Sequence, residues 1–354
     1  KYRKLKNKRV LSFCVVIILF LLLPVILDFL GLHNSTENFQ SIPSQDLGHP
    51  SPYIFIADEM SRTEEPVDIL ILGSSFGWTG LDASIIASGL SKEMGRKTTV
   101  LNFCSNWRGE DQYFIILRDL LLKRKVKMVL ISQPVWEFQK QYSWHYRASY
   151  FMRFSDRYLL SGLSLNDKIS WYSHLVLGAP RQLLSAIRPN IPLNPIPHSS
   201  TFGTMLKKRG FQGENFVYFK QSPIINKINR TYNYSITNSH FKIIDSKFPK
   251  FQTFWINHLS SLLTKNNISK ALISIPTWST RNDNYVKIYR ELIDIYDSTY
   301  IGIPPYELFG KMGPDKQKLF FYNEHMNYNG AEFFTESIVK TIVETYKKSL
   351  YRNE

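Results

Sequence analysis

A serine and a histidine near opposite ends of this 354-residue chain have the residue types needed for nucleophilic catalysis. Ser75 ends the tripeptide Gly73-Ser74-Ser75, directly after the apolar run Ile69 to Leu72, and His325 lies in the polar segment FFYNEHMNYNG. Gly77 and Gly80 are expected to keep the turn after Ser75 open. A serine hydroxyl becomes a nucleophile when an imidazole accepts its proton. Either loop alone also occurs in proteins without chemistry there, so the interpretation depends on a fold that brings the two loops together.

Apolar runs alternate with amphipathic segments in the order expected for a parallel sheet. Strands are predicted at residues 69–72, 97–103, 126–132, 271–276 and 300–303, and helices at 83–93, 110–123, 251–263, 285–296 and 331–349. We expect an α/β fold, a flavodoxin-like three-layer sandwich with a five-stranded parallel sheet. Ser75 follows the first strand and His325 follows the fifth. Both would emerge at the carboxyl edge of the sheet, where this topology lets them meet.

Residues 140–250 interrupt this alternation and predict a subdomain inserted between the third and fourth strands. Aromatic and arginine residues are interleaved over residues 142–158 (YSWHYRASYFMRFSDRY), and a helix pair is expected to run to Ile187. The aromatic–arginine stretch has three interpretations: helical core packing, a wall that stacks on glycans, or a surface against lipid headgroups.

The N-terminal segment predicts a membrane anchor. Residues 10–27 contain no charge, and eighteen apolar residues suffice for a helix to cross a bilayer. A cleaved signal peptide is the alternative, but no small-x-small site follows the run. Six basic residues in residues 1–9 favour the cytoplasmic side for that segment. We therefore expect a single-pass protein of the inner (cytoplasmic) membrane, with a cytoplasmic segment 1–9, an anchor 10–30, a linker 31–65 and a periplasmic or extracellular domain 66–349.

Composition narrows the classes of ligand and partner. The formal net charge of +15 favours an anionic polymer or an anionic membrane surface, and no basic repeat or binding motif indicates nucleic acid. Cys14 lies in the predicted anchor and Cys104 is alone beyond it, so the outer domain has no disulfide partner for Cys104. No metal and no cofactor are expected, because Cys and His residues lack ligand spacing and the Gly73 turn lacks a phosphate-binding Lys-Ser/Thr ending.

Two of these segments match blocks of a known superfamily. Gly73-Ser74-Ser75 is similar to its first block, and His325 to Ala331 (HMNYNGA) is similar to its last. Through them the chain resembles the SGNH (GDSL-like) hydrolase superfamily over residues 66–138 and 251–349. It looks most like the membrane-anchored O-acyltransferase branch of DltD and AlgX/AlgJ-type proteins. The resemblance implies that Ser75 is the nucleophile and His325 the general base.

The same resemblance implies a reaction and partners. We expect extracytoplasmic transfer of an acyl group, an acetyl group in this branch, to a cell-envelope polysaccharide or polymer, or hydrolysis of such an ester. Because acyl-CoA is absent outside the cytoplasm, a transferase would need a multi-pass membrane acyltransferase as donor. The alternatives are a catalytically silent SGNH-like binding or scaffold subunit of an envelope complex, and a lipid- or peptide-binding domain.

The chain departs from the superfamily pattern where His325 should be oriented. Tyr322 occupies the position of the usual aspartate, three residues before the histidine, which leaves Asp315, Glu324 or Asn323 to hold the imidazole. A carboxylate would do this best, because it balances the charge that develops on the ring.

The oxyanion donors also lack clean counterparts. The block-three asparagine is missing, since Ser132-Gln133-Pro134 follows the third strand, and Asn106 or Gly109 is nearest to the block-two glycine. The expected oxyanion and substrate-binding set is therefore the Ser75 backbone N–H with Gly73, Asn106, Gly109 and Asn327. Loss of one such donor typically lowers the rate by roughly 10²–10³-fold.

Overall fold

The computed structural model describes residues 2–32, 56, 59–60, 65–104, 109–133, 152–187, 241–245, 247–310, 325–326 and 328–351. The chain divides into two compact units. A helical unit comprises residues 1–43, 53–61 and 142–195, and a sheet unit comprises residues 44–52, 62–141 and 196–354. Each unit is described by itself.

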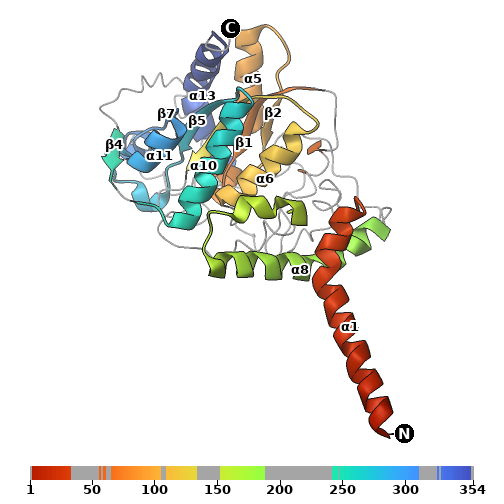
Figure 1. The fold of residues 1–354 in the computed structure, drawn as a ribbon. Coiled ribbons are helices and arrows are strands. Elements are labelled where there is room, and N and C mark those ends of the chain that lie inside the picture. The colour runs from red at the N-terminus through yellow and green to blue at the C-terminus, as the bar shows by residue number, and fades with distance from the viewer. Residues whose placement is uncertain are drawn as a thin grey trace. The chain divides into compact units, whose positions relative to one another are not determined.

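The sheet unit is built on a five-stranded parallel sheet (Figure 1). Its strands are β1 (Val67–Leu72), β2 (Val100–Asn102), β3 (Val126–Gln133), β5 (Ser269–Ser274) and β7 (Thr299–Ile301). Their order is β2-β1-β3-β5-β7, and every neighbouring pair is parallel. The predicted α/β class and five parallel strands are confirmed, and this order is compatible with a flavodoxin-like sandwich.

Helices cover both faces of this sheet. On one face, α5 (Ala83–Met94) and α13 (Tyr328–Tyr351) share an apolar core with inward side chains of the strands. On the other face lie α6 (Glu110–Leu121) and α10 (Lys250–Lys265), whose Phe114 and Trp255 rings are 5.7 Å apart (Figure 1). Because both faces are covered, the strands read as continuous apolar runs, and all six β1 residues are buried.

One buried charge interrupts the apolar β1 strand. Asp68 accepts hydrogen bonds from Arg96, Lys127, the Tyr346 hydroxyl and the backbone N–H of Thr99. Burial alone would raise the pKa of Asp68, but these donors outweigh it and lower the pKa to about 2. The carboxylate therefore ties α13 to β1.

The structure corrects the helix predicted at residues 285–296. The first part is strand β6 (Val286–Tyr289), which pairs in parallel with β4 (Phe241–Ile244) in a separate two-stranded sheet, and only α11 (Arg290–Tyr296) is helical. Three of the four β6 residues are buried, in a short β-branched and aromatic segment that fits a half-buried strand. The remaining short elements of the unit are η7 (Trp278–Thr280) and α12 (Pro305–Gly310).

The helical unit contains α1 (Tyr2–Phe29), η4 (Phe154–Leu160) and α8 (Leu165–Ile187). Within the described residues, α1 is the one helix long and apolar enough to cross a membrane, over Lys8–Phe29. Its orientation stays a prediction. The first member of the predicted helix pair is a 3₁₀ helix rather than an α-helix. Most of the predicted linker and of the stretch 142–158 lies outside the described residues.

Candidate active site

Ser75 is the first residue of a short helix that directly follows β1. This helix, α4 (Ser75–Gly80), replaces the open glycine turn expected from the sequence. Ser74 is its N-cap in an extended conformation, the Trp78 N–H donates to the Ser74 carbonyl, and the Thr79 hydroxyl donates to the Ser75 carbonyl at 2.9 Å. The strand–helix junction thus holds Ser75 at the carboxyl end of β1.

Three glycines let α4 lie directly on the ends of the neighbouring strands. A Cβ on Gly73 would be 2.5 Å from the Ser132 Cβ, and a Cβ on Gly77 would be 2.5 Å from the Cys104 Sγ. A Cβ on Gly80 would lie 2.8 Å from a methyl group of Ile275. Gly73, predicted for the oxyanion and substrate-binding set, therefore has a packing requirement of its own: no side chain fits there.

Asn102, at the end of β2, hydrogen-bonds to α4. The sequence did not predict this role. Its fully buried side-chain amide donates to the carbonyls of Gly77 and Leu81, both at 3.0 Å, and its Oδ1 accepts the Cys104 N–H at 3.0 Å. The only sequence signal was a polar residue at the end of an apolar strand. The amide bonds three buried backbone groups and so holds the middle and the C-cap of the helix that carries Ser75.

The structure brings Ser75 and His325 together although 250 residues separate them. The His325 Nε2 atom is 2.8 Å from the Ser75 Oγ atom, within hydrogen-bonding distance. Met326, the next residue, is buried in the core shared by the sheet, α5 and α13. The core therefore fixes the backbone that presents the imidazole.

The imidazole is held flat against an aromatic ring of α4. The rings of His325 and Phe76 are stacked, with centroids 4.7 Å apart and planes within 5°. Burial lowers the pKa of His325 to about 4, because the charged imidazolium would lose its hydration. His325 is therefore neutral at pH 7, and its Nε2 can accept the Ser75 proton when Nδ1 carries the ring hydrogen.

The other predicted site residues cannot be placed beside this pair. Asp315, Glu324, Asn106 and Asn327 lie outside the described residues, as do the alternatives Tyr322 and Asn323. Gly109 is the N-cap of α6, where its carbonyl accepts the backbone N–H groups of Gln112 and Tyr113. Across the parts of the chain that the structure describes, no group of three His, Cys, Asp or Glu residues is arranged to hold a metal ion.

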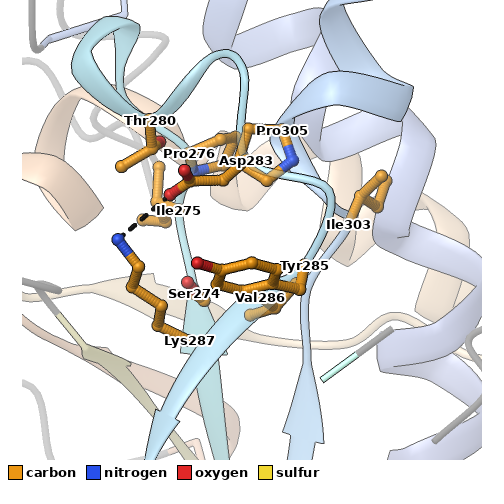
Figure 2. A pocket seen from close by; sticks show the side chains of 10 residues that line it. All are labelled: Ser274, Ile275, Pro276, Thr280, Asp283, Tyr285, Val286, Lys287, Ile303 and Pro305. Carbon is orange, nitrogen blue, oxygen red and sulfur yellow. Dashed lines mark ion pairs between the residues drawn. The ribbon is translucent and has the colours of Figure 1, made fainter. Parts of the chain in front are cut away.

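A shallow hollow opens between the carboxyl end of β5, strand β6 and the segment after β7 (Figure 2). Its enclosed volume is about 10 Å³, room for roughly one water molecule, and the rest of the hollow is open to solvent. The Tyr285 ring forms one wall, and an ion pair of 3.1 Å joins Lys287 to Asp283 across it (Figure 2). Ile275, which lines the hollow, is also the residue against which Gly80 packs. Gly80 lies about 7.5 Å along α4 from Ser75, so Ile275 contacts the end of α4 opposite to the serine.

Comparison with known proteins assigns no family: no family model matches the chain, and no curated protein matches it. The class of protein is therefore defined by the fold and the site. The chain is an α/β protein with a five-stranded parallel sheet, and a serine–histidine pair lies beyond the carboxyl end of its β1 strand.

Proposed function

We propose that the protein is an SGNH-like serine O-acyltransferase or esterase with a flavodoxin-like sandwich, which acts outside the cytoplasm on acyl esters of a cell-envelope polysaccharide or polymer. The observation that carries the proposal is the 2.8 Å contact between the Ser75 Oγ and a neutral, buried His325 Nε2. A hydroxyl beside an imidazole that can take its proton is the minimum for an activated oxygen nucleophile. The strand–helix junction at Ser75 and the similarity of the two sequence blocks support the same class.

In the first half-reaction, the Ser75 Oγ attacks the carbonyl carbon of the donor while its proton passes to the His325 Nε2. The tetrahedral intermediate collapses when the imidazolium returns that proton to the leaving oxygen, which leaves an acyl-serine. In the second half-reaction, the neutral His325 takes a proton from a sugar hydroxyl or from water. The new oxygen attacks the acyl carbon, Ser75 leaves as the protonated hydroxyl, and an ester or a free acid is released.

The negative charge on the carbonyl oxygen needs hydrogen-bond donors in both half-reactions. The Ser75 backbone N–H is the first candidate, since it belongs to the nucleophile itself, and residues 105–109 supply the second in our proposal. Stabilisation of this kind is usually the largest single contribution to acyl-transfer catalysis.

The acyl donor must reach the site from a membrane. Extracytoplasmic compartments have no acyl-CoA pool, and the single candidate span among the described residues cannot carry an acyl group across a bilayer. We therefore propose a multi-pass membrane acyltransferase as the partner. Its recovery with the full-length protein from native membranes tests this part of the proposal, and repeated purification without any such protein contradicts it.

The test of the activity uses the full-length chain in detergent, with an aryl acetate as acyl donor and with or without an oligosaccharide acceptor. Ser75→Ala and His325→Gln are each expected to lower turnover to the uncatalysed rate. Matched controls are Ser161→Ala, an exposed serine, and His258→Gln, a histidine that also packs on an aromatic ring, Phe254, but belongs to α10. Transfer to the acceptor identifies a transferase, and hydrolysis alone identifies an esterase. Absence of both in the wild-type protein contradicts the proposal and favours the catalytically silent scaffold.

A further inference from the structure

Helix α8 carries an apolar stripe that is covered at one end and bare at the other. Leu165, Ile169, Tyr172 and Val176 follow the i, i+4, i+7, i+11 spacing and therefore lie on one side of the helix. Val176 is only 4% exposed, whereas Leu165 and Ile169 are 71% and 59% exposed. The exposed Leu165 and Ile169 side chains form an apolar patch that continues the covered stripe, and such patches are typical of surfaces that contact a membrane or another protein.

The covered part of the stripe lies against α1, the candidate membrane span. The Tyr172 hydroxyl donates to the Leu21 carbonyl of α1 at 2.9 Å. Pro24 lies inside α1, where its missing N–H and its ring disturb the backbone hydrogen bonds of the preceding turn. The missing N–H of Pro24 leaves the Phe20 carbonyl without its helical donor, whereas the Leu21 carbonyl has a second lone pair with which it accepts the Tyr172 hydroxyl.

The end of α1 is also fixed to the segment that precedes α8. The Ser155 backbone N–H donates to the Asp28 carboxylate at 2.9 Å, and the Ser155 hydroxyl bonds the same carboxylate. Leu27 is 1% exposed, whereas α1 from Val10 to Leu22 is largely bare. These contacts fix the level along α1 at which α8 crosses it (Figure 1).

That level corresponds to a membrane interface if α1 spans a bilayer. Leu21 lies six residues before Leu27, the last residue of the uncharged run, which is about 9 Å along a helix. Helices that lie in the plane of a membrane bury their apolar face about 5–10 Å into the boundary between headgroups and acyl chains. The depth of the contact between α1 and α8 agrees with that range.

Exposed residues of η4, which precedes α8 in the chain, and one residue of α8 have the chemistry of a headgroup region. Tyr158 is exposed, and Arg157, which stacks on the Phe154 ring at 4.7 Å, is exposed as well. Lys168 lies on α8 itself, beside Ile169. Tyrosine, arginine and lysine are enriched at the interface because each combines an apolar stem with a polar end.

We propose that α8 is an interfacial helix, with Leu165 and Ile169 immersed in lipid on the same side of α8 that contacts α1. The partner is a lipid surface. The proposal rests on α1 crossing a membrane and is independent of the chemistry at Ser75, so either can fail without the other. Its consequence is that the chain is held at the membrane by two elements, the span and the helix that lies across its end.

The test places a fluorescent nitrobenzoxadiazole label on introduced cysteines of the full-length protein in a Cys14→Ala background, where the remaining native cysteine, Cys104, is buried. The Cys14→Ala protein without an introduced cysteine measures any label on Cys104. Leu165→Cys and Ile169→Cys report on the stripe. Ser170→Cys is the matched control, because Ser170 is exposed but points about 100° away from Ile169 around the helix. Each protein is reconstituted at low density into phosphatidylcholine–phosphatidylglycerol vesicles, with and without lipids that carry a doxyl quencher near the headgroup end of the acyl chain.

Both stripe labels are expected to show blue-shifted emission and several-fold stronger quenching by doxyl lipid than the Ser170 label. Water-like emission at all three positions would overturn the proposal. Blue-shifted emission at the stripe without doxyl quenching would overturn it too, because the stripe would then be covered by protein rather than by lipid.

Discussion

The pH dependence of Ser75 reactivity tests the role of His325 in detail. Burial holds the pKa of His325 at about 4, so about 99% of the imidazole is neutral at pH 6. An exposed histidine with a pKa near 6.5 would be only about 24% neutral at that pH. A base that stays neutral keeps accepting the Ser75 proton well into the acid range.

The assay is the rate of covalent inactivation by a fluorophosphonate, measured from pH 4 to pH 8 in the detergent-solubilised protein. We expect a flat rate from pH 8 to about pH 5 and a half-maximal rate near pH 4. The fold should persist over this range, because the pKa of Asp68 is about 2 and its carboxylate stays charged. A half-maximal rate near pH 6.5 in the wild-type protein would refute the reasoning.

A substitution at Phe76 tests whether burial by the stacked ring lowers the pKa of His325. Phe76→Leu keeps most of the apolar volume but removes the flat ring that covers one face of His325. Water then reaches the imidazolium more easily, so the pKa of His325 should rise and the pH of half-maximal inactivation should move toward pH 6.5. His258→Gln, the histidine control on α10, should leave the pH of half-maximal inactivation unchanged. An unchanged value in Phe76→Leu would show that the stacked ring does not set the pKa of His325.

Three further predictions concern the elements that position the site. Gly77→Ala should lower the free energy of unfolding by roughly 1–3 kcal/mol in chemical denaturation, because the new Cβ would lie 2.5 Å from the Cys104 Sγ, and Cys104→Ala should partly restore it. The control is Gly310→Ala, which has open space around its new Cβ, and equal losses at both glycines would contradict the packing argument. Asn102→Leu should cost roughly 2–4 kcal/mol, because it removes the amide that bonds two buried carbonyls and a buried N–H. A neutral result would show that water replaces the amide. Asp68→Asn should lower the free energy of unfolding by about 2 kcal/mol at pH 7. The low pKa of Asp68 stabilises the folded wild type above pH 3.8, the ordinary pKa of an aspartate, and this stability is lost as the pH falls toward 2. The free energies of unfolding of the two proteins should therefore become equal in acid, and a constant difference from pH 7 to pH 2 would contradict this prediction.

The sheet was predictable because its strands carry a strong local signal. Strands buried on both faces give continuous apolar runs such as β1, and amphipathic helices of more than ten residues such as α6 lie between them. The second sheet was not predictable in the same way. Strand β6 has four residues, leads directly into α11, and pairs with a strand more than forty residues upstream, so its identity depends on tertiary contacts.

The site followed from the sequence only as far as topology allows. Because both loops leave the same edge of a parallel sheet, the meeting of Ser75 and His325 could be anticipated, and the structure brings them within 2.8 Å. The contribution of Asn102 could not be anticipated, since a single amide at a strand end has no local pattern. The glycines were interpreted as keeping a turn open, whereas Gly77 is required by close packing on Cys104, a contact between distant segments.

Intact-mass analysis of the full-length protein tests most directly whether an acyl-serine forms. After rapid mixing with an aryl acetate and acid quenching, we expect a mass increase of one acetyl group, mapped to the peptide that contains Ser75. The adduct should be absent in Ser75→Ala and strongly reduced in His325→Gln. An adduct of equal amount in Ser75→Ala, or no adduct in a wild-type protein that turns the ester over, would contradict an acyl-Ser75 intermediate.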